Sequence, residues 1–175
     1  MIPLLRSFFL FPLSESARLA LVALLVLLGT SCKQSPVYEE YLQVGEEGWH
    51  QDSTAEFKVE IEDTTNPYVV QFNLRANDNY PYANLYLFRE VSSAADLEYR
   101  DTAQIILADR YGEWLGEGIG DLKTFRRPFR NQPLRFNEPG AYTFSFTQAM
   151  RKDQLEGIKS VGLTIYPYTN EFEKK

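Results

Sequence analysis

The chain has 175 residues and carries 24 acidic against 18 basic side chains, which gives a net charge of −6 at pH 7. An acidic chain is a poor binder of nucleic acid, because that affinity depends on neutralising phosphates. Its one cysteine excludes an internal disulfide, and its one histidine excludes zinc sites with two or three histidine ligands. The length fits one domain, and abundant Tyr and Phe favour strands.

The N-terminal region contains an uncharged apolar run at residues 19–29, directly after Arg18. The run is too short to span a hydrocarbon core of about 30 Å, which needs roughly 20 apolar residues. Small residues and then Cys32 follow, an order of charge, apolar run and small residues that is typical of a cleavable signal. This order argues against a buried free cysteine after a core helix, and the short run argues against an uncleaved anchor.

Cys32 and the residues before it resemble a bacterial lipobox, although Gly29 stands where the usual motif has Leu. The resemblance implies a signal peptide at residues 1–31, cleavage before Cys32, and acylation of its thiol. Two or more acyl chains would hold the protein stably on a lipid bilayer. Lys33, rather than Asp, follows the cysteine, and by the sorting rule of enteric bacteria this implies delivery to the outer membrane. Surface-exported lipoproteins of Bacteroidota carry acidic residues close behind the cysteine, whereas the first acids here are Glu39 and Glu40, so the protein is expected to face the periplasm.

Residues 32–50 show no lasting hydrophobic period and are interpreted as a tether that leads into the domain. Beyond residue 51, apolar side chains recur at every second position, the spacing of half-buried strands. Such strands are expected at residues 57–61, 68–75, 101–108, 142–147 and 161–165. Residues 85–88 are apolar on both faces, which predicts a central strand covered on both sides.

The segments between these strands are read as connections. Residues 92–98 are ambiguous, and residues 148–155 are expected to include a short helical turn. Four glycines within residues 109–121 exclude a stable helix there and favour a loop or a bulged edge. Pro128 and Pro133 exclude a central strand in the basic segment 122–135. Residues 169–175 are predicted to be a mobile tail.

Seven or eight short strands without a long amphipathic helix predict an all-β fold, a two-sheet β-sandwich over residues 51–168. A jelly-roll-like topology fits the strand count, and an immunoglobulin-like sandwich is the alternative, although the cysteine pair that would favour it is absent. The predicted core consists of Phe57, Val70, Phe72, Leu74, Leu85, Leu87, Phe144, Val161, Leu163 and Ile165.

The chain offers no convincing catalytic set. His50, with Asp52 two residues on, is the only histidine that a Ser-His-Asp site could use, and no serine stands in a nucleophile elbow. Four acids recur in the glycine-rich loop: Asp109, Glu113, Glu117 and Asp121. Their spacing is not that of an EF-hand, so a solvated turn is favoured over a calcium site. A carboxylate pair for glycoside hydrolysis stays open on spacing alone. We therefore predict no enzyme, no metal and no cofactor.

Two loops carry candidate binding residues. Trp114, with Gly116 and Gly118, stands in the glycine-rich loop, and Tyr80 and Tyr82 stand in another. Loop aromatics of a β-sandwich form interface hot spots or stack on sugars, whereas the alternative is that they plug the ends of the core. Both readings stay open for Trp114, and plugging is favoured for the tyrosines. The basic cluster at residues 123–135 is either a solvated face or a docking patch for an acidic partner.

Several stretches together resemble one family. They are WHQDS, NLRANDNYPYANLYLF, DTAQIILADRYGEWLGEGIGD, PGAYTFSFTQAMR and LEGIKSVGLTIY, in this order behind the lipobox. The chain is thus similar to GldH, the gliding-motility lipoproteins of Bacteroidota, except at the divergent residues 91–100. The resemblance implies a lipoprotein needed for surface gliding, a process tied to type IX secretion, with other envelope proteins as partners. It brings no catalytic residues, and the acylated Cys32 is the one site it maps. A carbohydrate-binding surface lipoprotein remains the alternative.

Overall fold

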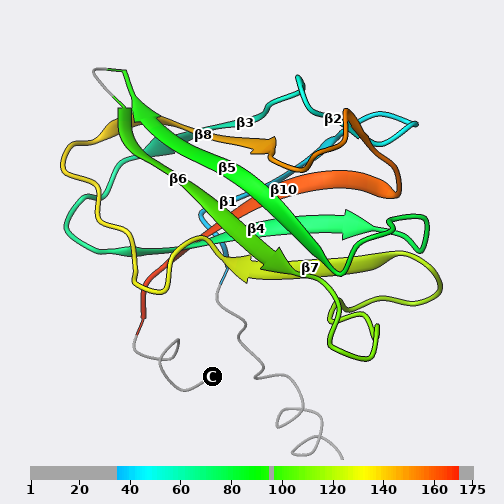
Figure 1. Cartoon of the computed structure of the whole chain (residues 1–175). Coiled ribbons are helices and arrows are strands. Elements are labelled where there is room, and N and C mark those ends of the chain that lie inside the picture. Colours follow the sequence, from blue (N-terminus) through cyan, green and yellow to red (C-terminus); the bar gives the residue numbers. More distant parts are fainter. Residues whose placement is uncertain (1–34, 95–96, 170–175) are drawn as a thin grey trace, which may run out of the picture. The chain divides into compact units, whose positions relative to one another are not determined.

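The computed structural model describes residues 35–94 and 97–169, and these form strands without any helix (Figure 1). The signal peptide, Cys32 and residues 170–175 of the predicted tail lie outside the described residues. The strands are β1 (Tyr38–Gln43), β2 (Trp49–His50), β3 (Ala55–Ile61), β4 (Tyr68–Ala76), β5 (Asn84–Ser93), β6 (Leu97–Ile106), β7 (Lys123–Pro128), β8 (Gly140–Gln148), β9 (Gln154–Leu155) and β10 (Ile158–Pro167). In this part of the chain, nothing forms a helix with the length and apolar character needed to cross a membrane.

Two four-stranded antiparallel sheets form the sandwich, with strand orders β1-β10-β4-β7 and β3-β8-β5-β6, and β2 pairs with β9 in a separate two-stranded sheet. The pairs are nested along the chain, because β5 pairs with β6, β4 with β7, β3 with β8, and β1 with β10. This nesting is the jelly-roll arrangement, in which the chain passes back and forth between two sheets. The two-sheet sandwich and its jelly-roll topology are therefore confirmed.

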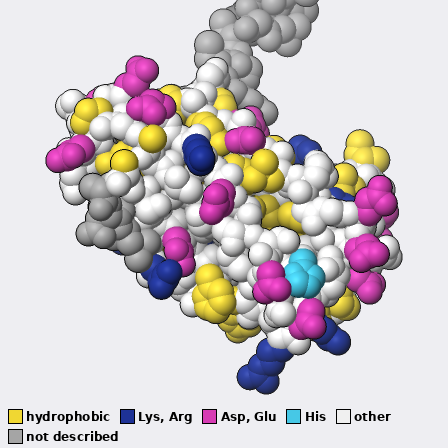
Figure 2. Space-filling view, turned by 90° about the horizontal axis from the view of Figure 1, so that it is seen from above, with side chains coloured by type: hydrophobic (Ala, Val, Ile, Leu, Met, Phe, Trp, Pro, Cys, Tyr) yellow, Lys and Arg dark blue, Asp and Glu magenta, His cyan; other side chains and the backbone are white. Residues whose placement is uncertain are grey.

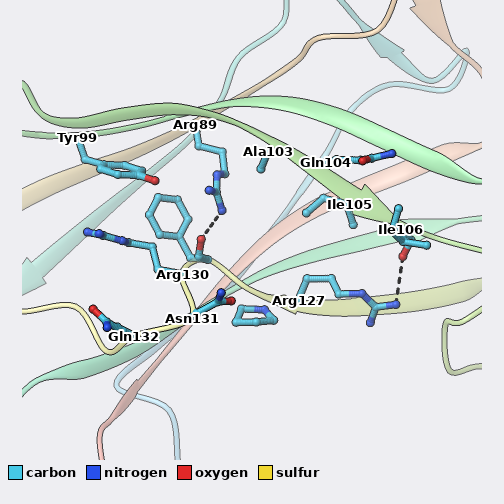
Figure 3. A pocket seen from close by; sticks show the side chains of 12 residues that line it. Arg89, Tyr99, Ala103, Gln104, Ile105, Ile106, Arg127, Arg130, Asn131 and Gln132 are labelled. Carbon is cyan, nitrogen blue, oxygen red and sulfur yellow. Dashed lines mark hydrogen bonds between the residues drawn. The ribbon is translucent and has the colours of Figure 1, made fainter.

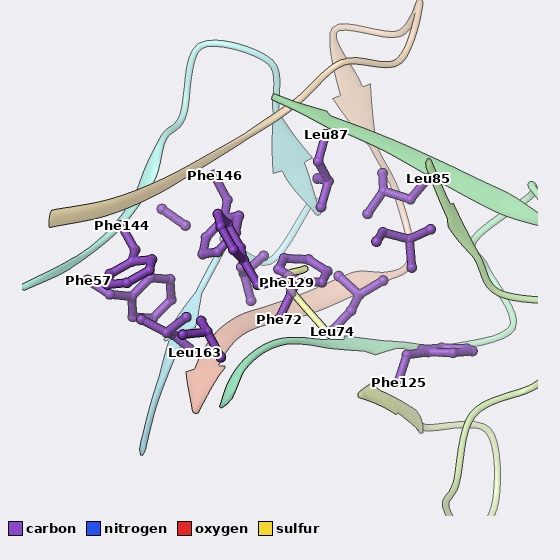
Figure 4. Close-up of a cluster of buried hydrophobic side chains, with 14 of the residues drawn as sticks. Phe57, Phe72, Leu74, Leu85, Leu87, Phe125, Phe129, Phe144, Phe146 and Leu163 are labelled. Atoms are coloured by element: carbon purple, nitrogen blue, oxygen red, sulfur yellow. The ribbon is translucent and has the colours of Figure 1, made fainter. Parts of the chain in front are cut away.

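The hydrophobic core lies between the sheets (Figure 4). Buried and exposed residues alternate strictly along β3, and the apolar members of this pattern point inward, as period-two spacing requires. Phe72 of one sheet meets Phe146 of the other with ring centroids 5.0 Å apart. All ten predicted core residues are buried.

The tether predicted at residues 32–50 is wrong from Tyr38 onward. Residues 38–43 form β1, which pairs with β10, and Trp49 is fully buried at the start of β2. Edge strands such as β1 bury only part of one face, and Glu39 and Glu40 are exposed, so the sequence there lacks a clear period. The sandwich consequently begins before residue 51.

Three further predictions need correction. Only the inner face of β5 is covered, because Tyr86 and Phe88 point outward, so the apolar run 85–88 is not covered on both sides. The described residues of the ambiguous segment 92–98 belong to β5 and β6, where Ser92 pairs with Leu97. No helical turn occurs at residues 148–155; instead, the Gln148 side chain donates to the Lys152 carbonyl and accepts from the Met150 amide. This side chain satisfies backbone groups that a helical turn would otherwise pair.

Candidate functional site

The glycine-rich loop, residues 109–122, connects β6 to β7 at one end of the sandwich (Figure 1). The described chain enters at the other end, where the Val37 amide donates to the Ile165 carbonyl. It leaves at that same end, where the Tyr168 amide donates to the Pro67 carbonyl. Since β4 runs from Tyr68 to Ala76 and Ala76 pairs with Lys123, the loop lies a full strand length from the point of entry.

Hydrogen bonds hold the loop in one shape. The Asp109 carboxylate accepts the amides of Tyr111 and Glu113 at 2.8 and 3.0 Å, and Glu117 exchanges backbone hydrogen bonds with Thr124. These bonds place Asp109 in a turn and Glu117 beside β7. In the described residues, no group of three His, Cys, Asp or Glu side chains is positioned to bind a metal ion.

Gly116 and Gly118 are places of close approach within this loop. A Cβ atom at Gly116 would lie 2.8 Å from the Phe125 ring, and one at Gly118 would lie 2.2 Å from the Leu122 carbonyl oxygen. Because Cβ atoms do not come so close to other atoms, any other residue would displace the ring or the backbone. The two predicted interaction glycines thus shape the loop itself.

The predicted aromatic residues also pack internally. Trp114 is half-buried and lies against Phe125, with ring centroids 5.6 Å apart. Tyr80 is buried and donates its hydroxyl to the Asn84 carbonyl, and Tyr82 meets the Tyr80 ring edge-on at 5.7 Å. Their packing matches the plugging interpretation. It also makes Trp114 a poor probe of binding, because its removal would disturb the core.

Four other apolar side chains of the loop face solvent, and we call them the apolar tip: Tyr111, Leu115, Ile119 and Leu122. Ile119 is 99% exposed and Tyr111 is 74% exposed. None of them was among the predicted interaction residues, because a loop has no period that separates exposed from buried positions. The sequence feature that could have identified them is the occurrence of bulky apolar residues in a segment whose glycines exclude a helix.

A second feature is a cleft of about 650 Å³ between the edge strands β6 and β7, lined in part by Arg89, Arg127 and Arg130 (Figure 3). We call it the arginine cleft. Arg89 comes from β5, whereas Arg127 and Arg130 come from the predicted basic segment. The jelly-roll pairing therefore brings together cations that are distant in sequence, and Arg89 was not predicted.

Arg89 is buried and fully paired. Its Nε donates to the Asp101 carboxylate at 2.7 Å, and its Nη1 donates to the Phe129 carbonyl. Burial raises the pKa of Asp101, but hydrogen bonds from Arg89 and Tyr99, together with the charges of Arg89 and Arg130, outweigh burial and lower this pKa below its ordinary value. Asp101 therefore stays ionised and balances one of the three guanidinium charges.

The other two arginines of the cleft lack such a partner among the described residues. Arg127 donates to the carbonyls of Arg126 and Ile106 at 3.0 and 3.2 Å. The Arg130 guanidinium lies over the Tyr99 ring, 4.9 Å from its centroid. Neither forms an ion pair with a described carboxylate, so the cleft is positive in a chain whose net charge is −6.

The face of the molecule seen in Figure 2 carries acidic side chains spread among separate hydrophobic patches. The one histidine of the chain also lies on this face, and its Nδ1 accepts the Asp52 amide at 3.2 Å. On the outer face of β5, Phe88 is 50% exposed. Neither the surroundings of His50 nor the outer face of β5 brings a nucleophile, a base and an oxyanion site together among the described residues.

Sequence comparisons identify relatives of this chain. A family model described as GldH lipoprotein matches residues 36–165. The gliding motility lipoprotein GldH homolog of Christiangramia forsetii is 36% identical over 147 residues, which cover 80% of this chain and 89% of the relative. The gliding motility lipoprotein GldH of Flavobacterium johnsoniae is 32% identical over 160 residues, which cover 87% of this chain and 96% of the relative.

Solved structures give a more distant likeness. A family GH115 4-O-methyl-α-glucuronidase with specificity for decorated arabinogalactans aligns with a TM-score of 0.45 and 9% identity, over 79% of this chain and 18% of that chain. Dimeric latent PorU of Porphyromonas gingivalis aligns with a TM-score of 0.27 and 11% identity, over 79% of this chain and 14% of that chain. The present chain thus spans only a small part of each of these larger proteins.

Proposed function

The chain belongs to the GldH family of gliding-motility lipoproteins, and we propose that it is a non-enzymatic assembly component of gliding machinery linked to type IX secretion. On this proposal the acylated Cys32 holds it on the outer membrane, facing the periplasm, and the apolar tip docks another envelope protein. The exposure of the apolar tip at the end opposite to chain entry is the observation that carries the proposal.

Chain geometry supports a protein partner for this tip. Val37 stands five residues after Cys32, and an extended chain spans at most about 3.6 Å per residue, so the near end of the sandwich lies within about 18 Å of the lipid anchor. The nine residues of β4 span about 30 Å from that end to the loop. The apolar tip therefore lies at the end of the sandwich opposite to the end that is connected to Cys32.

The charges around the apolar tip also disfavour insertion into lipid. The loop carries the carboxylates of Asp109, Glu113, Glu117 and Asp121, and the negative surface potential of anionic lipids attracts basic rather than acidic segments. Aromatic and aliphatic side chains in a polar rim are, by contrast, the usual composition of a protein interface. The tip is small, so its partner would be bound through a few anchor residues.

The test replaces Leu115 and Ile119 with Ser in one variant. Both side chains are exposed, so the melting temperature should stay within about 2 °C of the wild type, because surface substitutions change stability by about 0.5 kcal/mol or less. Colony spreading should be lost, and crosslinked pull-down of envelope partners should fall at least tenfold. The matched control is Phe88→Ser, which removes an exposed apolar side chain from β5. If the double variant is as abundant as the wild type and colonies spread normally, the loop is not needed for the proposed function.

The alternative, a carbohydrate-binding surface lipoprotein, rests on the outward-facing aromatic pair Tyr86 and Phe88 of β5. Proteinase K treatment of intact cells separates the two proposals. A periplasm-facing protein is protected until the outer membrane is broken, whereas a surface lipoprotein is digested at once. Digestion on intact cells, combined with loss of function in Phe88→Ser, would favour carbohydrate binding.

A further inference from the structure

Strand β6 is an edge of its sheet, and its backbone has unused hydrogen-bonding groups beside the arginine cleft. The Leu107 amide donates to the Ala83 carbonyl across the β5–β6 ladder, and the Ala149 amide reaches the Tyr86 carbonyl from the other side of β5. In an antiparallel ladder, alternate residues turn their peptide groups to opposite sides. Thr102 and Gln104 therefore direct their N–H and C=O groups to the open edge, and no described residue pairs with these groups there.

On the facing edge of the other sheet, most of the outward backbone groups of β7 are already bonded or absent. Thr124 of β7 exchanges hydrogen bonds with Glu117, the Arg126 carbonyl accepts from the Arg127 guanidinium, and Pro128 has no amide proton. A strand added at this side of the sandwich would accordingly find more free pairing groups on β6 than on β7. Arg127 already donates to the Ile106 carbonyl on the edge of β6, so its guanidinium lies beside the space that such a strand would fill.

The charge of the arginine cleft and the packing of its aromatic rings limit the class of ligand that it can bind. Arg127 and Arg130 have no described carboxylate partner, so the cleft favours an acidic ligand. The Arg130 guanidinium lies over one face of the Tyr99 ring, and the Phe129 ring packs against Tyr99 with centroids 5.6 Å apart, so the ring is less available for stacking on a sugar. Unused peptide groups next to unpaired guanidinium groups fit an extended acidic peptide better than a saccharide.

We propose that the arginine cleft binds an extended acidic segment of a partner protein, which adds as a strand to β6 along Thr102–Gln104 and places carboxylates against Arg127 and Arg130. Side chains on one face of a strand recur about every 6.6 Å, so the segment would carry its acids at alternate positions. The cleft and the apolar tip consist of different residues. The experiments below therefore test this site independently of the docking function proposed for the tip.

The experiment uses the full lipidated protein, purified from membranes in detergent, and the dye-labelled peptide acetyl-TEVEVT-amide as the probe. Fluorescence anisotropy should show binding that weakens as salt is raised, and the Gln peptide acetyl-TQVQVT-amide should bind at least tenfold more weakly. The double variant Arg127→Gln, Arg130→Gln should lose binding by a similar factor. The matched control Arg151→Gln, which removes an exposed arginine of the β8–β9 connection, should bind as the wild type does.

Backbone pairing is tested separately with Gln104→Pro, which removes one outward amide and leaves the β5–β6 ladder bonds in place. We expect loss of peptide binding with the melting temperature retained. If this variant unfolds, a peptide N-methylated at alternate residues tests the same bond from the ligand side and should not bind. Equal binding of the Glu and Gln peptides, or full binding by the arginine double variant, would overturn the proposal. Tight binding of trigalacturonate that survives Gln104→Pro would also overturn it and identify a saccharide site.

Discussion

At the scale of single residues, the pair of Arg89 and Asp101 is the most consequential interaction beside the cleft. The side chain of Arg89 is 9% exposed and that of Asp101 is 31% exposed, so the arginine depends on this carboxylate for its charge balance. The same carboxylate accepts the Tyr99 hydroxyl, and Arg89 also donates to the Phe129 carbonyl. The pair thereby connects β5, β6 and the segment after β7.

Replacing Asp101 with Asn should destabilise the protein by about 3 kcal/mol at neutral pH, because it leaves a buried guanidinium without its counter-charge. The pKa of Asp101 is lowered in the folded protein from its ordinary 3.8. Its contribution to stability is therefore present above that value and disappears as the pH falls through the lower folded pKa. Urea unfolding followed from pH 7 to pH 2.5 should show the difference between variant and wild type shrinking in acid.

The control for this prediction is Glu117→Gln, which breaks the exposed ion pair of Glu117 with Arg126, 2.9 Å long in the structure. Exposed pairs contribute about 1 kcal/mol or less, so this variant should unfold almost as the wild type does. A difference for Asp101→Asn that stays constant across the whole pH range would show that the carboxylate acts through packing and not through its charge.

At the scale of elements, period-two alternation identified the inner residues of β3, β4, β8 and β10, because the alternate apolar side chains of each strand lie in the core, although in β10 the residues between them are buried as well. It missed β1, whose exposed acids Glu39 and Glu40 interrupt the pattern, and it misread β5, whose outer aromatic residues look like core residues in sequence. Alternation reports which residues are apolar, but it does not report whether a second layer covers them.

The candidate binding features were harder to predict from the sequence for a related reason. The glycines of the loop at residues 109–122 marked an irregular segment, yet only the tertiary structure shows that Trp114 packs on Phe125 while Ile119 faces solvent. The basic cluster was visible in sequence, but its meeting with Arg89 depends on the pairing of β5 with β6 and of β4 with β7. Long-range strand pairing leaves no local signal in the sequence.

A pair of phenylalanine variants tests the two faces of the sheet that contains β5 and β8. Phe144 is completely buried between the sheets, so Phe144→Ala should cost about 3–5 kcal/mol in the free energy of unfolding. Phe88 is half exposed on the outer face, so Phe88→Ala should cost about 1 kcal/mol or less. Urea denaturation at 25 °C measures both, and similar losses for the two variants would mean that the outer face of β5 is covered after all.

At the scale of the whole molecule, the two ends of the described fold differ in structure. The chain enters and leaves at one end, and the apolar tip occupies the other, while the arginine cleft opens along the side between β6 and β7. A lipid at Cys32 would limit how far the end at which the chain enters the sandwich can move from the membrane, because the connection from Cys32 to β1 is short. Anchoring would also confine the protein to the neighbourhood of other envelope proteins and raise its effective concentration there.

Replacing Cys32 with Ala tests that anchor, because it removes the thiol that would carry the acyl chains. Cells that express this variant should incorporate no palmitate analogue into the protein, which should remain unprocessed or appear in the soluble fraction, and colony spreading should be lost. The sandwich itself should be unaffected, because the strands begin only at Tyr38. The control Ser31→Ala keeps the thiol and should be labelled like the wild type.

Label in the Cys32→Ala variant would show that another residue carries the lipid. Unlabelled variant protein that still supports spreading would show that the domain reaches its partner without the membrane. Loss of spreading by an unlabelled, soluble and folded variant would instead locate the defect in anchoring, because the apolar tip and the arginine cleft would both be intact in that protein.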